Sequence, residues 1–405
     1  MDIFNSLTSK DLILISIPIV SSFVGWITNK IALKMTFYPI EFKGVRPFGW
    51  QGIIPSKAKK MAETAVELWT SKLINIEEEF QRVESDKIAD AMQESTAIMS
   101  KNIIDEVMEA KMPKLWHKSP QAIKDNVYER VRMELPLVVK DVMQDVHSNF
   151  SELLDLKFLA VTSLTQRKEL LNQVFLNCGK KEFKFIEHSG FYFGFLFGLI
   201  QMVVWYFYPL WWTLPLAGLI VGYFTNVIAL RLIFRPLNPI RLGKIVIQGM
   251  FIKRQSEVSE EYSKIVAAKI INVENIFEYI IRGPGSKKLN EIIKARLDEV
   301  ILKAAGILKE LVEFSTDSKI FVHIRNIASY RFMQELPISI RQVFGYTDEA
   351  LNLKKVLESR MKGLSPIEFE EFLRPVFKED EKKLILVGAI LGSIAGLMQY
   401  LIIFN

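Results

Sequence analysis

Long apolar runs without any charged residue constrain the fold of this chain more than any other feature. Residues 191–210, 211–230 and 384–404 contain no Asp, Glu, Lys or Arg. A helix needs about 20 such residues to cross the hydrocarbon core of a bilayer, so each run predicts a crossing helix. The run at 12–27 is shorter and crosses only if the helix continues to residue 33, with Lys30 reaching toward the surface. We therefore expect four crossing helices, at about residues 12–33, 189–208, 211–233 and 384–404.

The first of these runs has an alternative interpretation as a cleaved signal peptide. Asp2 and Asp11 flank the run where basic residues are expected, and no small-residue cleavage motif follows it. We therefore favour a crossing helix over a signal peptide for this segment.

The order of the four predicted helices determines which segments share a side of the membrane. The connection at 205–215 is short and rich in aromatic residues and proline, a composition typical of a membrane interface. The second and third helices then form a hairpin, so both long intervening segments lie on one side and both termini on the other. Basic residues such as Lys30, Lys34, Arg231 and Arg235 stand beside the long segments. The positive-inside rule therefore predicts cytoplasmic helical domains, with both termini outside.

The sequence contains an internal repeat. Gly25-Trp-Ile-Thr-Asn-Lys-Ile-Ala-Leu33 returns as Gly222-Tyr-Phe-Thr-Asn-Val-Ile-Ala-Leu230, and each copy closes with a glycine-rich apolar helix. Self-similarity at a fixed spacing indicates two copies of one structural element. We expect one repeat at residues 10–208 and a second at 209–405, each entering and leaving the same membrane face. Such copies form a tandem parallel repeat with a pseudo-twofold axis.

Each repeat is expected to hold a small β-hairpin and a helical domain between its two crossings. Residues 39–55 and 236–252 contain glycine, proline and residues that favour strands, which predicts one hairpin in each segment. The two hairpins could pair into one small sheet. Residues 57–186 and 254–380 show apolar residues at helical spacing with charges between them. The expected fold is a mainly α membrane protein with two long helical domains.

Glycine recurs at every fourth position near the end of each repeat, and a glutamine follows the last glycine. This spacing puts a smooth stripe on one helix face, so that a neighbouring backbone can approach closely. We interpret the stripe as a packing surface, with Gln201 and Gln399 hydrogen-bonded between helices. The alternative is a lipid or substrate path along the groove. The six glycines are Gly190, Gly194, Gly198, Gly388, Gly392 and Gly396.

A Thr-Asn pair at the cytoplasmic end of the first helix of each repeat is the candidate polar site. An unpaired amide at this depth is costly, so each asparagine needs a partner. One interpretation is a hydrogen bond to glutamine or backbone that clamps two helices together. The alternative is a site for a polar headgroup or an ion, with basic side chains supplying charge for phosphate. The candidate residues are Thr28, Asn29, Lys30, Lys34, Thr225, Asn226, Arg231, Arg235, Gln201 and Gln399.

Catalytic and metal-binding patterns are missing from the sequence. The 4 histidines have no ligand-like spacing, no G-x-S-x-G or H-E-x-x-H occurs, and the single Cys178 excludes a Cys-rich zinc site. We expect no enzyme activity, no catalytic residue, no cofactor and no metal. The net charge of +6 is concentrated beside the apolar runs, which favours anionic lipid headgroups over nucleic acid as partners.

Three strings, Gly-x-x-Thr-Asn-x-Ile-Ala-Leu, Phe-x-Pro and Gln-Gly-x-x-Pro-x-Lys, together with the closing glycine helix, resemble a bacterial family. This is domain of unknown function 445, the group of YheB-like and YjiN-like membrane proteins. The resemblance covers both tandem repeats and implies a multi-pass protein of the bacterial cytoplasmic (inner) membrane. The family brings no established reaction, substrate or cofactor. Ile252 replaces the proline of the third string in the second copy, so any site there is expected to differ between copies.

These features lead to two hypotheses for function. The first is a non-enzymatic membrane scaffold whose helical domains bind a partner protein, another copy of the chain or the anionic membrane surface. The alternative is a protein that binds or transfers a lipid or small molecule, with an apolar groove opening at the bilayer. A groove lined by Met, Ile and Val would favour the alternative, whereas a fully packed core would favour the scaffold.

Overall fold

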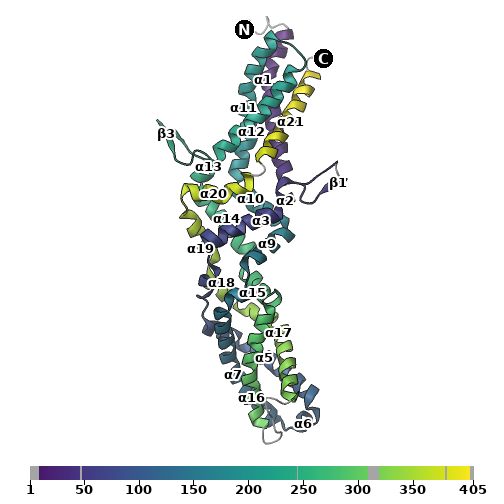
Figure 1. The fold of residues 1–405 in the computed structure, drawn as a ribbon, viewed down its shortest axis with the longest axis vertical. Coiled ribbons are helices and arrows are strands. Elements are labelled where there is room, and N and C mark those ends of the chain that lie inside the picture. Colours follow the sequence, from purple (N-terminus) through teal and green to yellow (C-terminus); the bar gives the residue numbers. More distant parts are fainter. Residues whose placement is uncertain (1–8, 46–47, 244, 309–318, 379–380, 402–405) are drawn as a thin grey trace, which may run out of the picture. The chain divides into compact units, whose positions relative to one another are not determined.

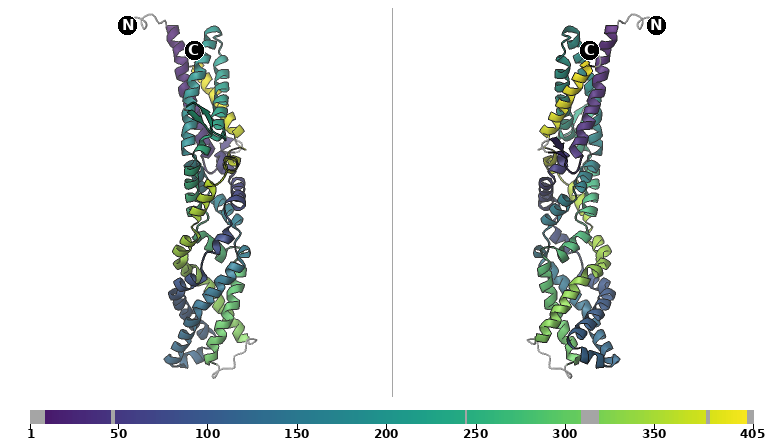
Figure 2. Two further views of the ribbon diagram at one scale, coloured as in Figure 1. Left: turned by 90° about the vertical axis from the view of Figure 1, so that its left-hand side faces the viewer. Right: turned by 90° about the vertical axis from the view of Figure 1, so that its right-hand side faces the viewer.

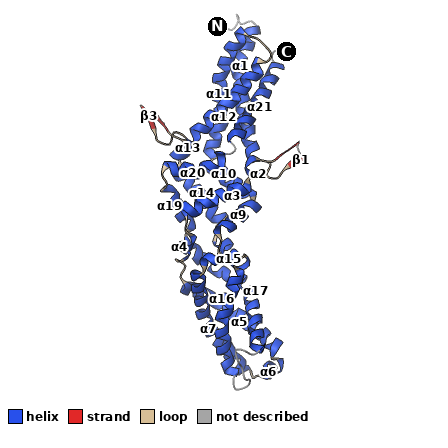
Figure 3. Cartoon of the chain, in the orientation of Figure 1, coloured by secondary structure: helices blue, strands red, loops and turns tan. Residues whose placement is uncertain are grey.

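The computed structural model describes residues 9–45, 48–243, 245–308, 319–378 and 381–401, and it divides into two compact units. The membrane unit consists of residues 1–73, 161–266 and 357–405, and the helical unit of residues 74–160 and 267–356. Among the described residues, helices dominate both units and strands occur only in two hairpins (Figure 3). The expected mainly α membrane protein is confirmed. The division into repeats at 10–208 and 209–405 remains a prediction, since each unit takes segments from both halves of the chain.

Four helices of the membrane unit pack side by side (Figures 1 and 2). Helix α1 packs along α11, and α12 packs along α21. Within the described residues, three segments are long and apolar enough to cross a membrane, namely Leu14–Phe37, Lys180–Phe207 and Thr213–Phe234. Crossing by α21 therefore remains a prediction. The helices are α1 (Ser9–Phe37), α11 (Lys180–Phe207), α12 (Thr213–Phe234) and α21 (Glu381–Gln399).

Glycine allows the helices of each pair to approach closely. A side chain at Gly25 of α1 would collide with the carbonyl oxygen of Gly190 in α11. A side chain at Gly222 of α12 would collide in the same way with the carbonyl of Gly388 in α21. The backbones approach closely at both places, as small residues at a helix contact allow.

A short hairpin follows α1 and another follows α12. Strands β1 (Lys43–Val45) and β2 (Phe48–Trp50) pair antiparallel, as do β3 (Ile240–Leu242) and β4 (Ile245–Ile247). Gly44 has a φ of +116°, a conformation that L side chains rarely adopt. The possibility that the hairpins join into one sheet is wrong, because in the described residues each forms its own two-stranded sheet. Figure 1 shows them projecting from the bundle in different directions.

Shorter helices complete the membrane unit beside the hairpins. Its core there includes Trp69, whose indole donates a hydrogen bond to the Tyr262 hydroxyl, and the buried Glu182, which forms an ion pair with the partly exposed Arg254. Three helices continue across the boundary between the units. The elements are α2 (Ile53–Ser56), α3 (Ala58–Leu68), the π-helical turn η2 (Trp69–Leu73), α9 (Leu156–Gln166), α10 (Lys168–Cys178), α13 (Met250–Lys253), α14 (Gln255–Lys269), α19 (Leu353–Lys362) and α20 (Pro366–Lys378).

The helical unit is built around four long helices. Helix α5 (Ser85–Lys111) packs on α7 (Gln121–Ser148) and α17 (Lys319–Ser339), and α16 (Ser286–Leu308) also packs on α7 and α17. Apolar residues at helical spacing face inward from all four, as the sequence periodicity predicts. The remaining elements are α4 (Ile76–Phe80), α6 (Pro113–Lys118), α8 (Phe150–Leu153), α15 (Val273–Arg282), the 3₁₀ turn η3 (Ile340–Val343) and α18 (Phe344–Leu351).

Candidate functional site

The two asparagines of the membrane unit each join a pair of helices. The Asn29 side chain donates to the carbonyl of Ile186 in α11 at 2.8 Å, and the Asn226 side chain donates to the carbonyl of Leu384 in α21 at 3.4 Å. Both asparagines are only 1% exposed. These bonds satisfy one amide hydrogen of each side chain and hold α1 to α11 and α12 to α21.

The other polar side chains of the bundle meet in a small central cavity. Ser21 donates to the Gln201 carbonyl oxygen at 3.0 Å, which links α1 to α11. The Gln399 amide nitrogen is buried and has no hydrogen-bond partner among the described residues. A cavity of about 20 Å³ touches these three residues together with Thr28 and Thr225, and that volume accommodates about one water molecule.

The four basic candidates do not converge on a single point with these residues. Lys30 forms an ion pair with Glu187 at 3.6 Å, and Arg235 forms one with Glu370 at 3.3 Å. Lys34 and Arg231 are exposed at the ends of α1 and α12. Lys30 and Lys34 lie in the C-terminal part of α1, and Arg231 and Arg235 lie at the C-terminal end of α12, so the headgroup site remains a prediction.

A groove of about 360 Å³ lies between α11 and α12 within the membrane unit. Apolar and aromatic side chains line it, including Phe197, Val204, Tyr208 and Trp212, and Gln201 borders it from the polar cavity side. The lining is as apolar as a hydrocarbon tail. Lipid as an occupant of this groove remains a prediction.

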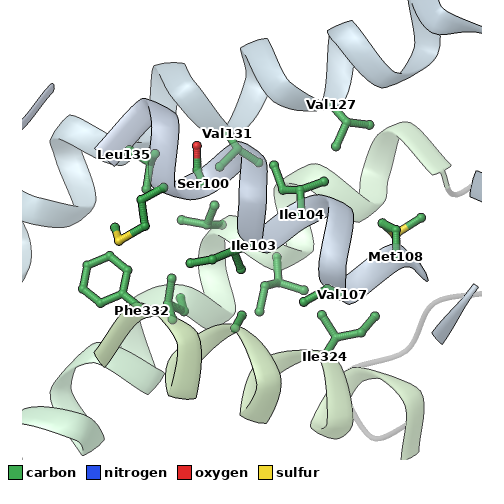
Figure 4. Close-up of a pocket in the computed structure, with 15 residues that line it drawn as sticks. Ser100, Ile103, Ile104, Val107, Met108, Val127, Val131, Leu135, Ile324 and Phe332 are labelled. Atoms are coloured by element: carbon green, nitrogen blue, oxygen red, sulfur yellow. The ribbon is translucent and has the colours of Figure 1, made fainter. Parts of the chain in front are cut away.

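A second apolar space lies inside the helical unit, between α5, α7, α16 and α17 (Figure 4). This interior cavity has a volume of about 120 Å³. Ser100 is the single polar residue among those that border it, and its hydroxyl already donates to the carbonyl of Ala97 at 2.8 Å. The lining is Met99, Ser100, Ile103, Ile104, Val107, Met108, Val127, Val131, Leu135, Leu297, Val300, Ile301, Ile324, Ala328 and Phe332.

A second apolar space of the helical unit shares Phe332 with the interior cavity. This smaller space of about 50 Å³ also has Met92, Val139 and Ile293 in its wall. Phe332 therefore borders two apolar spaces along the same helices.

Polar contacts hold the helices at one end of the interior cavity. Asp105 accepts hydrogen bonds from the Trp116 indole at 3.1 Å and from the Tyr128 hydroxyl, which links α5, α6 and α7. Burial, followed by the hydrogen bond to Asp105, raises the pKa of Tyr128. The phenol is therefore neutral at physiological pH, and it holds α7 against α5 beside the cavity residues Ile104 and Met108.

The interior cavity could not be located from the sequence. Periodicity identifies Ile103, Val107 and Ile324 as inward-facing residues, but it does not show whether the opposing faces fill the space between them. The one sequence signal is the presence of small residues, Ser100 and Ala328, at positions where large apolar residues would close the gap.

Metal binding has no support from the described residues. In that part of the chain, no group of three or more His, Cys, Asp or Glu side chains is arranged to hold a metal ion. Burial raises the pKa of the Cys178 thiol to about 12, so this cysteine is protonated and unreactive at physiological pH.

Comparison with known proteins finds distant relatives among bacterial membrane proteins. UPF0754 membrane proteins of Bacillus cereus and Bacillus mycoides are 24% identical to the chain over 204 residues, and one of Bacillus thuringiensis is 23% identical over 199 residues. Each match covers 44% of this chain and 53% of the relative, so the chain spans about half the length of the curated relatives it matches. No family model matches the chain, and no solved structure is significantly similar to it.

This chain is a mainly helical membrane protein. The similarity and the three apolar helices agree on that conclusion. The name of the relatives gives a location in the membrane and no activity. Any further function has to be argued from the chain itself.

Proposed function

We propose that this protein is a membrane-anchored binding protein for an apolar molecule, whose hydrocarbon part occupies the interior cavity of the helical unit. The supporting observation is the composition of the cavity wall, which is formed by Met, Ile, Val, Leu, Phe and Ala apart from a single serine with a satisfied hydroxyl. A wall of this kind offers no hydrogen-bond partner to water or to a charged ligand. Its lining of Met, Ile and Val is the composition expected of a lipid-binding groove, although it lies in the helical unit, whereas the groove expected from the sequence opens at the bilayer.

The size of the interior cavity supports a ligand with a slender apolar part. An engineered cavity of about 150 Å³ with a similar lining stays dry and binds benzene, and this cavity is of comparable volume at about 120 Å³. The end of an acyl chain is a ligand of that width. Movement of the Phe332 ring would lengthen the space available to the acyl chain, because the ring forms part of both cavity walls.

We also propose that the chain is a tandem member of the domain of unknown function 445 family, with four crossings and cytoplasmic helical domains. The equivalent bonds of Asn29 and Asn226, each to a carbonyl of its neighbouring helix, support the repeat. The packing of α21 along α12 through Gly388 supports a fourth crossing, and the exposed Lys34 and Arg231 support the orientation.

Native mass spectrometry of the full chain, extracted from its own membrane in mild detergent, tests the binding function. We expect a bound lipid or fatty acid that survives washing, and extraction of the sample identifies which of the two it is. Ala328→Leu places a larger side chain in the cavity wall and should abolish the bound mass. Tyr330→Leu introduces the same side chain at a position 61% exposed on the same helix and should leave the bound mass unchanged.

The same experiment separates binding from the scaffold hypothesis. A chain that carries no apolar ligand, takes up no added palmitate and runs as a defined oligomer would contradict the proposal and support a membrane scaffold. Equal ligand retention in Ala328→Leu and Tyr330→Leu would also contradict it, because the ligand would then lie outside the interior cavity.

A further inference from the structure

The hairpin β1–β2 is fixed to the end of a membrane helix. The Trp50 indole at its base donates to the carbonyl of Met35 in α1 at 3.2 Å. The Gln51 amide closes the base by donating to the carbonyl of Ile40 at 2.7 Å. The hairpin therefore cannot turn freely about the chain, and its position is set by α1.

The hairpin β3–β4 is closed in the same way after α12. The Gln248 amide donates to the carbonyl of Leu237 at 3.0 Å, and the backbone N–H of Gly249 donates to the carbonyl of Pro236 at 2.9 Å. Both hairpins are thus held where their membrane helices end, and both project away from the bundle (Figure 1).

The tip of β1–β2 exposes large apolar side chains. Val45 and Phe48 pair across the two strands, and they are 80% and 91% exposed. In β3–β4, the side chains of Ile240, Val246 and Ile247 are also exposed. Two cross-strand apolar neighbours with this exposure are unusual on a surface that meets only water.

The exposed apolar surface of α1 leads toward this hairpin. Residues at four-residue spacing along α1 form an exposed apolar stripe on a helix that is long and apolar enough to cross a membrane. Tyr38 and Phe42 continue the exposed apolar surface between the helix end and β1. The stripe residues are Ile15, Ile19, Phe23, Ile27 and Ile31.

Basic side chains accompany the exposed apolar residues of both hairpins. Lys43 in β1 and Arg241 in β3 are exposed, and so are Lys34 and Arg231 at the ends of the preceding helices. Exposed Lys and Arg near a bilayer attract anionic phospholipid headgroups. The combination of exposed apolar residues with flanking positive charge matches the composition of a surface that lies in a membrane interface.

We propose that both hairpins insert their apolar residues into the headgroup region of the bilayer that the membrane helices cross, with Lys43 and Arg241 against anionic headgroups. The hairpins then act as two lateral anchors that fix the depth and tilt of the bundle. The bilayer is the occupant because the apolar surface of the hairpin continues from the exposed apolar stripe of α1. This inference concerns the membrane unit alone and does not depend on the ligand proposed for the helical unit.

Fluorescence from a label at the hairpin tip tests this inference. Phe48→Cys is labelled with an environment-sensitive nitrobenzoxadiazole dye; Cys178 is buried and stays unlabelled. The full chain is reconstituted into phosphatidylcholine vesicles containing phosphatidylglycerol and lipids that carry a doxyl quencher near the headgroup. We expect blue-shifted emission and strong quenching. Two exposed positions serve as controls. Phe195→Cys on α11 is the control for a label in the membrane, and Gln121→Cys on α7 is the control for a label in water.

Each outcome decides the inference. Quenching at position 48 close to that of position 195 supports insertion. The double variant Lys43→Glu, Arg241→Glu should then reduce quenching at position 48 more in vesicles that contain phosphatidylglycerol than in pure phosphatidylcholine vesicles. Red emission without quenching, as expected at position 121, would show that the tip stays in water and overturn the inference. Blue-shifted emission without doxyl quenching would mean that a second protein copy covers the tip, which also overturns it.

Discussion

Replacing Ala328 by leucine measures the energy of the space between the four helices. In a lipid-free chain, a cavity of about 120 Å³ costs about 3 kcal/mol at roughly 24 cal/mol per Å³. Leucine adds three carbons, and each buried methylene contributes about 0.8 kcal/mol. Lost side-chain entropy of about 0.5–1 kcal/mol and imperfect fit reduce the gain. We therefore expect Ala328→Leu to stabilise the helical unit by about 1–2 kcal/mol, which is opposite in sign to a typical core enlargement.

Hydrogen exchange measured by mass spectrometry is the appropriate assay. It reports the free energy of local opening for peptides from α5, α7, α16 and α17 without assuming that the whole chain unfolds in one step. The matched control is Ala89→Leu, which makes the same change at a buried alanine of α5 outside the lining of the interior cavity. With no space to fill, we expect Ala89→Leu to destabilise the unit by about 1–3 kcal/mol.

The comparison of the two variants can refute the reasoning. If Ala328→Leu destabilises the helical unit as much as Ala89→Leu, the four helices leave no usable space between them. The binding proposal then loses its supporting observation. If Ala328→Leu stabilises the unit in lipid-free protein and less so in protein with bound ligand, the difference gives the energy that the ligand contributes in the cavity.

Three further predictions concern other parts of the molecule. Gly190→Ala should lower the free energy of unfolding in detergent by about 1–3 kcal/mol, since its methyl group meets the carbonyl of Gly25, whereas Gly345→Ala, with nothing within 4 Å, should not. Cys178 should resist maleimide in the native protein at pH 8 and react after denaturation, because burial raises its pKa to about 12; labelling before denaturation would contradict its burial. Burial lowers the pKa of His147 below its usual 6.5, so the unfolded state binds a proton before the folded state does. Hydrogen exchange should therefore show stability falling as the pH drops below about 6.5, and His147→Phe should remove that dependence.

Much of the fold follows from the sequence because it depends on local pattern. Uncharged runs identify α11 and α12, and the Gly- and Pro-containing segments after α1 and α12 identify the two hairpins. Whether the hairpins pair with each other depends on long-range geometry. The possibility that they form one sheet was wrong for that reason. The sequence also could not show that the helices of 57–186 and 254–380 would combine into shared units, since periodicity gives the apolar face of a helix and not its partner.

The candidate site was predictable only in part. The need for a partner at Asn29 follows from the cost of burying an amide, but the acceptor, the Ile186 carbonyl, depends on the crossing of α1 and α11. Ser21, the partner of Gln201, has no distinguishing signal because serine is common in membrane helices. The interior cavity is a mismatch between four packed faces, and a mismatch of this kind is not encoded at any single residue.

The discontinuous make-up of the two units has a consequence for biosynthesis. Helices α5 and α7 leave the ribosome well before α16 and α17, and α11 and α12 are synthesised between the two pairs. The inward apolar faces of α5 and α7 therefore remain partly exposed while two membrane helices are inserted. A chaperone that shields apolar surface would be needed during that interval. A nascent chain arrested before α16 should be degraded, and a separately translated fragment carrying α16 and α17 should rescue it.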